Sequence, residues 1–161
     1  MCNYDFQHLT DLLNWSDFKV NIFANWAITG SRYLKSKAGY NIEGNKMEFV
    51  PLYNLKGGLT AQYKRISMAL QAGFTSFQFT DAANEPMDPN DAVYGIYGAI
   101  PGYCVVDLNL DYRLNKYIDL VLSFQNINNS IYMTRRASGY PGPGIIPSAP
   151  FNFMGTVMFH L

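Results

Sequence analysis

The residues best suited to grip a ligand are two adjacent arginines, Arg135 and Arg136, which lie between Tyr132 and Tyr140. A guanidinium group presents a rigid fork of N–H donors that matches a carboxylate in bidentate fashion. Arginines in an exterior loop can instead pair locally or contact lipid head groups. We therefore take Arg135, Arg136 and Tyr140 as candidate ligand-binding residues in a loop.

Two other groups of residues suggest chemistry less specifically. An acidic stretch without Lys or Arg runs between residues 80 and 101, and hard cations such as calcium prefer oxygen ligands. The spacing of its carboxylates matches no calcium loop, so a solvated acidic loop is the simpler interpretation. The four carboxylates are those of Asp81, Glu85, Asp88 and Asp91.

The two histidines, His8 and His160, are far apart and belong to no motif with a carboxylate or a nucleophile. No pattern of catalytic, metal-binding or cofactor-binding residues emerges, and we predict that the protein is not an enzyme. Cys2 and Cys104 are also distant, and we interpret them as unpaired.

The elements that must position these residues are strands, most clearly at residues 102–126. Two runs of alternating apolar and polar residues flank a short polar turn in this segment. A strand repeats every two residues, so the pattern predicts an antiparallel hairpin with one apolar and one polar face. Ten alternating residues also suffice for a tilted strand to cross a bilayer.

The same alternation recurs along the chain. It predicts strands at residues 18–28, 53–63, 66–75 and 151–161. In the strand at residues 18–28, Phe23 is the one residue that intrudes on the polar face. Residues 2–13 are ambiguous and could form an incomplete first strand. Short turns alternate with long connections at 30–48, 80–101 and 129–149, as in outer-membrane barrels.

Composition agrees with a membrane strand protein. Only 15% of the 161 residues are charged, well below the roughly 25% of a typical globular protein, and 16% are aromatic. No run approaches the roughly 18 apolar residues of a transmembrane helix. The net charge is zero and no basic face stands out, so nucleic acid is not an expected partner.

The last third resembles the C-terminal part of TonB-dependent outer-membrane receptors, which import ferric chelates and similar nutrients. The matching segments are VVDLNLDYRLNKYIDLVLSFQNINNSIY, at residues 105–132, and TRRASGYPGPGIIPSAPFNFMGTVMFHL, at residues 134–161. Residues 48–59 and 79–85 also resemble the family. Ser148-Ala149-Pro150 and the final Leu161 depart from it, because Gly-Arg and a terminal aromatic are usual there.

The resemblance implies an all-β fold, an antiparallel meander of transmembrane hairpins. We expect residues 1–161 to form six or seven strands of a larger outer-membrane barrel, without a plug or signal peptide. The implied function is the barrel segment of a siderophore or ferric-chelate receptor, in the outer membrane of a Gram-negative bacterium and not active alone. Its implied partners are lipid, the remaining strands and plug, TonB through that plug, and the barrel-insertion machinery.

The terminal segment is similar to the signal that the insertion machinery recognises, and we assign that role to Phe159 and Leu161. Two rival interpretations remain open at this level. One is a small, self-contained eight-stranded outer-membrane barrel. The other is a soluble lipocalin-like binding barrel with its apolar faces turned inward.

Overall fold

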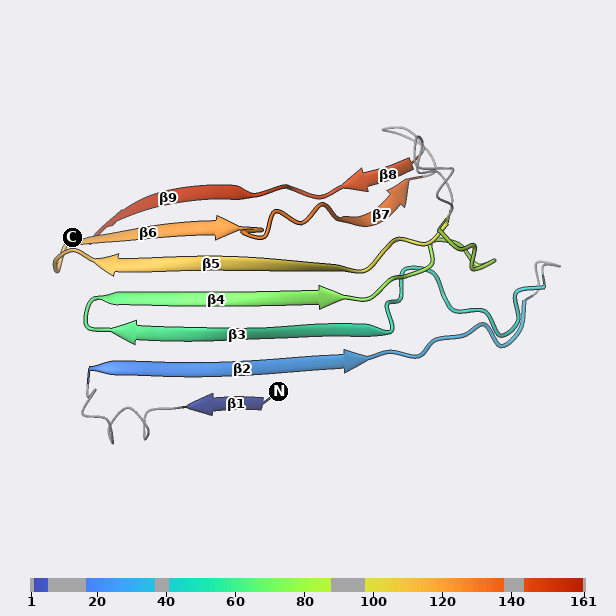
Figure 1. Ribbon diagram of the computed structural model, residues 1–161, viewed down its shortest axis with the longest axis horizontal. Helices are drawn as coiled ribbons and strands as arrows, with labels where there is room; N and C mark the ends of the chain where they lie inside the picture. Colours follow the sequence, from blue (N-terminus) through green and yellow to red (C-terminus); the bar gives the residue numbers. More distant parts are fainter. Residues whose placement is uncertain (1, 6–16, 37–40, 88–97, 138–143, 161) are drawn as a thin grey trace.

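The computed structural model describes residues 2–5, 17–36, 41–87, 98–137 and 144–160. One sheet dominates these residues, with short turns at one end of its strands and long connections at the other (Figure 1). No helix among them is long and apolar enough to cross a membrane.

Seven strands form the sheet in the order β1-β2-β3-β4-β5-β6-β9, and every neighbouring pair is antiparallel. This confirms the predicted meander, including the doubtful first strand. The strands are β1 (Cys2–Asp5), β2 (Phe18–Ile28), β3 (Tyr53–Tyr63), β4 (Ile66–Thr75), β5 (Tyr103–Arg113), β6 (Ile118–Gln125) and β9 (Asn152–Phe159).

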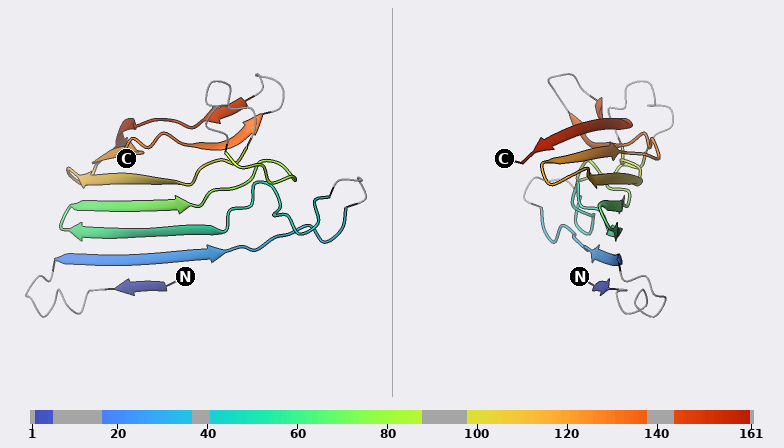
Figure 2. Two further views of the ribbon diagram at one scale, coloured as in Figure 1. Left: turned by 45° about the vertical axis from the view of Figure 1, so that its right-hand side comes forward. Right: turned by 90° about the vertical axis from the view of Figure 1, so that its left-hand side faces the viewer.

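The sheet is open. Among the described residues β1 pairs only with β2, and β9 pairs only with β6. Viewed along the strands, the sheet follows an arc whose two ends do not meet (Figure 2). The two edge strands therefore present backbone groups without a partner strand in this part of the chain.

The register aligns like with like across the sheet. Because paired residues share a face, each apolar position of one strand meets an apolar position of the next. Leu108, for example, pairs with Leu70 on one side and with Phe124 on the other. From β2 to β9 this row is Ile22, Leu59, Leu70, Leu108, Phe124 and Phe153, and the neighbouring row on the polar face is Asn21, Thr60, Ala69, Asn109, Ser123 and Met154.

Phe23, the large apolar residue on the polar face, has a specific neighbour. It pairs directly with Gly58, and a Cβ atom on that glycine would lie 2.4 Å from the Phe23 ring. The absence of a side chain at Gly58 thus makes room for the ring on the polar face. Sheets use the same device where an aromatic ring covers a glycine on the neighbouring strand.

Two asparagines that follow β6, Asn126 and Asn128, make side-chain hydrogen bonds at the end of the β5–β6 pair. Asn126 is 2% exposed and has φ 53°, a left-handed conformation that asparagine tolerates better than most residues. Its side chain accepts a hydrogen bond from the Ser130 backbone nitrogen (2.8 Å) and donates to the carbonyls of Ser130 (2.9 Å) and Ala149 (3.3 Å). Asn128 bridges back to Cys104 and Val106 on β5.

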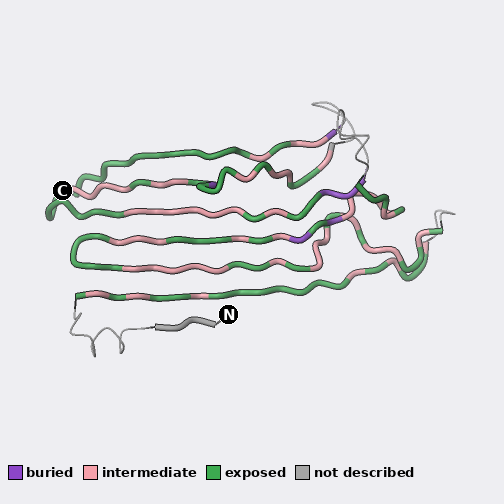
Figure 3. The backbone as a smooth tube through the Cα atoms, in the orientation of Figure 1, coloured by how far each residue is buried: buried purple, intermediate pink, exposed green. Residues whose placement is uncertain are grey.

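Burial is concentrated outside the sheet. Among the described residues, those that are buried are Ser76, Gln78, Gly98, Ala99, Ile100, Asn126 and Gly144, and most lie near the long connections (Figure 3). The apolar face of the sheet stays open, as Trp26 (80% exposed) illustrates. A single sheet has no second layer to cover it, so this face needs another apolar environment.

The third long connection, predicted to be a loop, contains a second sheet. β7 (Met133–Ala137) and β8 (Gly144–Pro147) pair antiparallel, with a register shift between Met133 and Arg135. The prediction missed this hairpin because its strands are only five and four residues long. Neither is long enough to display a clear period of two.

Candidate ligand site at the loop end of the sheet

Two long connections are clasped together at the loop end. One joins β2 to β3 and the other joins β4 to β5. Asn84, with φ 60°, accepts a hydrogen bond from the Lys46 backbone nitrogen (2.6 Å) and donates to the Lys46 carbonyl (2.7 Å). Asn45 donates to the carbonyls of Ala82 (2.9 Å) and Ala83 (3.2 Å). These contacts fix the backbone on both sides of Lys46.

Further bonds brace the same region. The Phe49 nitrogen donates to the Phe79 carbonyl at 2.8 Å. Within the first connection, the Tyr33 hydroxyl donates a hydrogen bond to the Glu48 carboxylate. That bond raises the pKa of the Tyr33 hydroxyl above its usual value of 10.0, with smaller contributions from desolvation and from the Glu48 charge.

A cavity of about 220 Å³ lies beside the clasp. Lys46 places its ammonium group 5.3 Å from the ring centre of Phe77 and 5.9 Å from that of Phe79. The two rings meet edge to face, 5.7 Å apart. Arg32 also lines the cavity, together with Leu52 and Gln78.

The cavity is cationic as well as aromatic. Neither Lys46 nor Arg32 forms an ion pair with a carboxylate in the described part of the chain. Among the described residues, Arg32 makes one long hydrogen bond, to the Gly44 carbonyl (3.4 Å), and the Glu48 carboxylate accepts a hydrogen bond from Tyr33. Two positive groups beside aromatic rings suit an anion that carries a flat or apolar portion.

The arginines singled out from the sequence lie elsewhere, on β7. Arg135 is exposed. Arg136 is half-buried and donates from Nη2 to the Gly98 carbonyl at 3.0 Å, which ties β7 to the connection before β5. The structure thus gives Arg136 a bracing contact, while ligand binding by either arginine stays a prediction. Tyr140 lies outside the described residues.

Other sequence candidates are distributed over the sheet. Phe159 ends β9 and is 72% exposed, whereas Leu161 lies outside the described residues. His160 contacts the Asp119 carboxylate at 2.9 Å. His8, Asp88 and Asp91 are not described. Among the residues that are, no group of three or more His, Cys, Asp or Glu could hold a metal ion.

Sequence reasoning missed the cavity because its residues come from separate segments. Lys46 precedes Phe77 by about thirty residues, and nothing in either segment indicates the other. Phe77 and Phe79 flank Gln78 just after β4 ends, out of phase with the apolar residues of β4, and this short aromatic pattern is the one signal available.

The fold and its two surfaces define a class of protein: the wall of an antiparallel β-barrel, apolar on one face and polar on the other. Residues 3–129 match the model of the TonB-dependent receptor-like β-barrel family. The match covers most of the chain, and the chain belongs to this family. Membership favours the receptor barrel over the lipocalin-like and eight-stranded alternatives.

Solved structures agree on the fold. The ferric citrate transporter FecA, unliganded, aligns with a TM-score of 0.78 at 22% identity, over 98% of this chain and 23% of that one. The siderophore receptor PiuA from Acinetobacter baumannii aligns with a TM-score of 0.65 at 18% identity, over 89% of this chain and 20% of that one. The closed form of the ferric-catecholate import receptor Fiu from E. coli K12 aligns with a TM-score of 0.64 at 19% identity, over 89% of this chain and 19% of that one.

The chain spans about a fifth to a quarter of the length of these structures. At these identities the likeness is one of fold, and the three similar structures are those of a transporter and two receptors. A comparison with curated proteins gave no match.

Proposed function

We propose that this chain forms part of the wall and outer loops of an outer-membrane, TonB-dependent receptor that imports ferric chelates. The observation that carries the proposal is the set of unbroken apolar rows running across β2 to β6 and on to β9. Such a surface is stable against lipid, where each strand is also hydrogen-bonded to its neighbours.

Strand length and the ends of the strands support a bilayer setting. β2, β3 and β5 each have 11 residues, enough for a tilted strand to cross the hydrocarbon core. Exposed aromatic rings lie near both ends, with Tyr63 and Tyr112 at the short turns and Trp26 and Tyr53 towards the long connections. Aromatic rings favour the two membrane–water interfaces.

The polar face would line the barrel interior. Its side chains are small and mostly neutral, as at Thr60, Asn109 and Ser123. These groups would brace a plug, and TonB would act through that plug. The remaining strands, the insertion machinery and lipid complete the set of partners that we propose.

The loop-end cavity is the binding surface we favour for the chelate. Lys46 and Arg32 would neutralise its negative charge, while Phe77 and Phe79 would contact its flat or apolar portion. Arg135, Arg136 and Tyr140 remain a second candidate contact. Ferric citrate and a ferric catecholate, the cargoes after which two of the similar structures are named, are the natural first probes.

The test is a binding titration, followed by fluorescence, of a complete receptor barrel that contains this chain and is folded in detergent micelles. Ferric citrate and a ferric catecholate are each titrated into the parent, Lys46→Gln and Lys35→Gln. Lys35 is an exposed lysine of the same connection that does not line the cavity. We expect saturable binding of at least one chelate, weakened several-fold by Lys46→Gln alone. Equal affinities in all three proteins would contradict the cavity as the site, and no binding of either chelate would count against the proposed cargo.

A further inference from the structure

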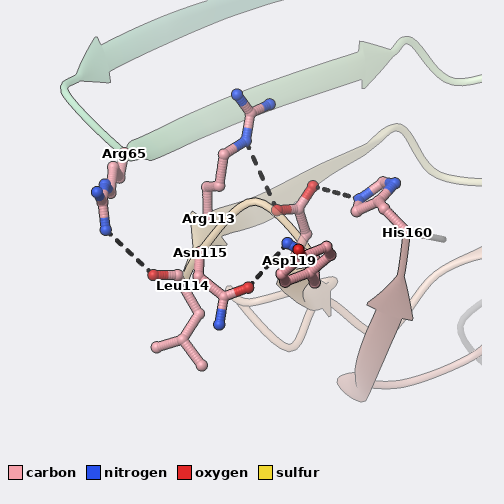
Figure 4. A network of polar contacts seen from close by, with 7 residues as sticks. Arg65, Arg113, Leu114, Asn115, Asp119 and His160 are labelled. Atoms are coloured by element: carbon pink, nitrogen blue, oxygen red, sulfur yellow. Dashed lines mark hydrogen bonds and ion pairs between the residues drawn. The ribbon is translucent and has the colours of Figure 1, made fainter.

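The short-turn end of the sheet carries a patch of basic and aromatic side chains. We define the basic rim as Lys64 and Arg65, in the β3–β4 turn, and Lys116, in the β5–β6 turn. The two turns are joined, because Arg65 donates from Nη1 to the Leu114 carbonyl at 3.1 Å (Figure 4). The Arg113 nitrogen also donates to the Arg65 carbonyl at 2.9 Å. The rim is therefore one connected surface.

Each rim lysine lies over a tyrosine of its own turn. Lys64 Nζ is 5.1 Å from the ring centre of Tyr63, and Lys116 Nζ is 4.7 Å from that of Tyr117. Both rings are about half exposed, at 48% and 53%. A lysine over a tyrosine ring presents an apolar body with a cation at its tip, which suits the boundary between an apolar and a polar phase.

Two carboxylates, those of Asp111 and Asp119, line the same hollow as Lys64 and Arg65. Asp119 is already engaged, by Arg113 Nε at 3.6 Å and by His160 Nε2 at 2.9 Å (Figure 4). Within the described ranges, no carboxylate forms an ion pair with Lys64, Arg65 or Lys116. The end of the sheet thus presents three positive groups in two adjacent turns.

The β3–β4 turn is chemically unusual for its shape. Tyr63 pairs with Ile66, so Lys64 and Arg65 are the two loop residues of a tight hairpin. Asn-Gly is the favoured pair in such turns because positive φ is then easily adopted. Here Lys64 has φ 51°, a conformation that asparagine or glycine would adopt more readily. A charged lysine therefore occupies a turn position whose backbone conformation favours asparagine or glycine.

The basic rim is continuous with the apolar face. Phe18 pairs with Tyr63, Tyr63 with Ile66, and Ile66 with Tyr112, so a row of large apolar side chains lies next to the turn lysines. A ligand that fits both surfaces has an anionic head and an apolar tail. Nucleic acid and acidic peptides offer the charge without the tail.

We propose that the basic rim binds the phosphodiester of anionic phospholipids of the phosphatidylglycerol type, in the leaflet that the short turns reach. This assignment rests on the proposed membrane function, and it goes beyond the import of a chelate. Lys64 and Lys116 contact the lipid phosphate, Arg65 holds the two turns together, and Tyr63 and Tyr117 lie at the level of the glycerol backbone. The rim selects lipid by charge and fixes the depth at which the short turns lie in the membrane.

The experiment measures lipid preference in zwitterionic detergent micelles. Short-chain phosphatidylglycerol and phosphatidylcholine are titrated separately into the parent, into a Lys64→Gln/Lys116→Gln variant and into a Lys35→Gln/Lys56→Gln variant. Both double variants lose two exposed lysines, and Arg65 is left intact because it bonds the neighbouring turn. Glycerol phosphate, an anionic phosphate without acyl chains, is a third titrant.

We expect the parent to bind phosphatidylglycerol more tightly than phosphatidylcholine, and added salt to weaken that preference. A basic residue near an anionic surface contributes about 1 kcal/mol, so losing two rim lysines should weaken phosphatidylglycerol binding by about 30-fold at low salt. The Lys35→Gln/Lys56→Gln variant should keep the parent's affinity. Glycerol phosphate should bind far more weakly than the lipid.

Three results would overturn the assignment. Equal affinity of the parent for both lipids would do so, as would an equal loss in both double variants, or glycerol phosphate binding as tightly as the lipid. A parent that folds in micelles and binds a ferric chelate, but shows no lipid preference, overturns the lipid site alone. A parent that takes up no detergent overturns the membrane setting on which both proposals rest.

Discussion

The backbone nitrogen of Asn126 donates a hydrogen bond to the Asp107 carboxylate at 2.8 Å, at the point where the β5–β6 ladder ends. The next nitrogen, that of Ile127, returns to the Val106 carbonyl at 2.8 Å. The Asp107 carboxylate thus accepts the hydrogen bond of the Asn126 nitrogen, in place of a backbone carbonyl of β5. The chain can leave the sheet here without an unsatisfied buried donor.

We predict that Asn126→Ala destabilises the protein by about 1–3 kcal/mol, because it leaves buried partners unsatisfied. Asn126→Gly should relieve the positive φ but still lose the side-chain bonds, so it should fall between Ala and the parent. Asn41→Ala, at an exposed asparagine of the β2–β3 connection, is the control and should be near neutral. Urea unfolding in micelles measures all three. An Asn126→Ala penalty no larger than that of the control would contradict the closing role.

Gly58 and Gly73 give a second matched pair, both on the polar face. A Cβ atom at Gly58 would lie 2.9 Å from the rigid Leu70 carbonyl oxygen as well as 2.4 Å from the Phe23 ring, whereas nothing lies within 4 Å of one at Gly73. Gly58→Ala should therefore cost about 1–3 kcal/mol. Gly73→Ala should be neutral or slightly stabilising. Equal effects on the free energy of unfolding would show that the Phe23–Gly58 packing is unimportant.

The strands were predictable from sequence because their signal is local. Alternation alone located β2 to β6 and β9 and assigned each residue to a face, since a period of two leaves only two choices. β1 stayed ambiguous because four residues hold too few alternations. Phe23 looked like an exception until the register placed Gly58 opposite it.

The loop end was not predictable in the same way. Its contacts join residues far apart in sequence, such as Arg136 with Gly98 and Asn45 with Ala82. Arg135 and Arg136 were chosen because they are adjacent, yet Arg136 braces another connection while Arg135 is exposed. Lys46, in contrast, has no suggestive neighbour in sequence and gains its aromatic partners only through the fold.

The open edges lead to a prediction about this chain by itself. β1 and β9 each have one free edge in the described structure, and free edges invite pairing with other chains. Expressed alone in plain buffer, the 161-residue chain should aggregate or require a partner segment. Analytical ultracentrifugation and thermal unfolding measure this. A monomer with a sharp, reversible transition would contradict it.

The terminal strand leads to a prediction about assembly. Phe159 is exposed on the last strand, where an insertion factor could read alternate side chains by strand addition. Grafted onto a full-length receptor, the tail at residues 151–161 should support assembly, Leu161→Phe should improve it, and Phe159→Asp should abolish it. Yield in the outer-membrane fraction measures the effect. A Phe159→Asp tail that assembles as well as the parent would contradict the assignment.

The central claim is that one face of the sheet meets lipid and the other does not, and adjacent residues of β5 test it. Leu108 lies in the middle of an apolar row, and Asn109 lies on the opposite face. In a complete barrel that contains this chain and is folded into a bilayer, Leu108→Arg should lower the free energy of unfolding by about 2–4 kcal/mol, measured by denaturant titration. Asn109→Lys should have a much smaller effect. Equal penalties at the two positions would contradict the lipid-facing assignment.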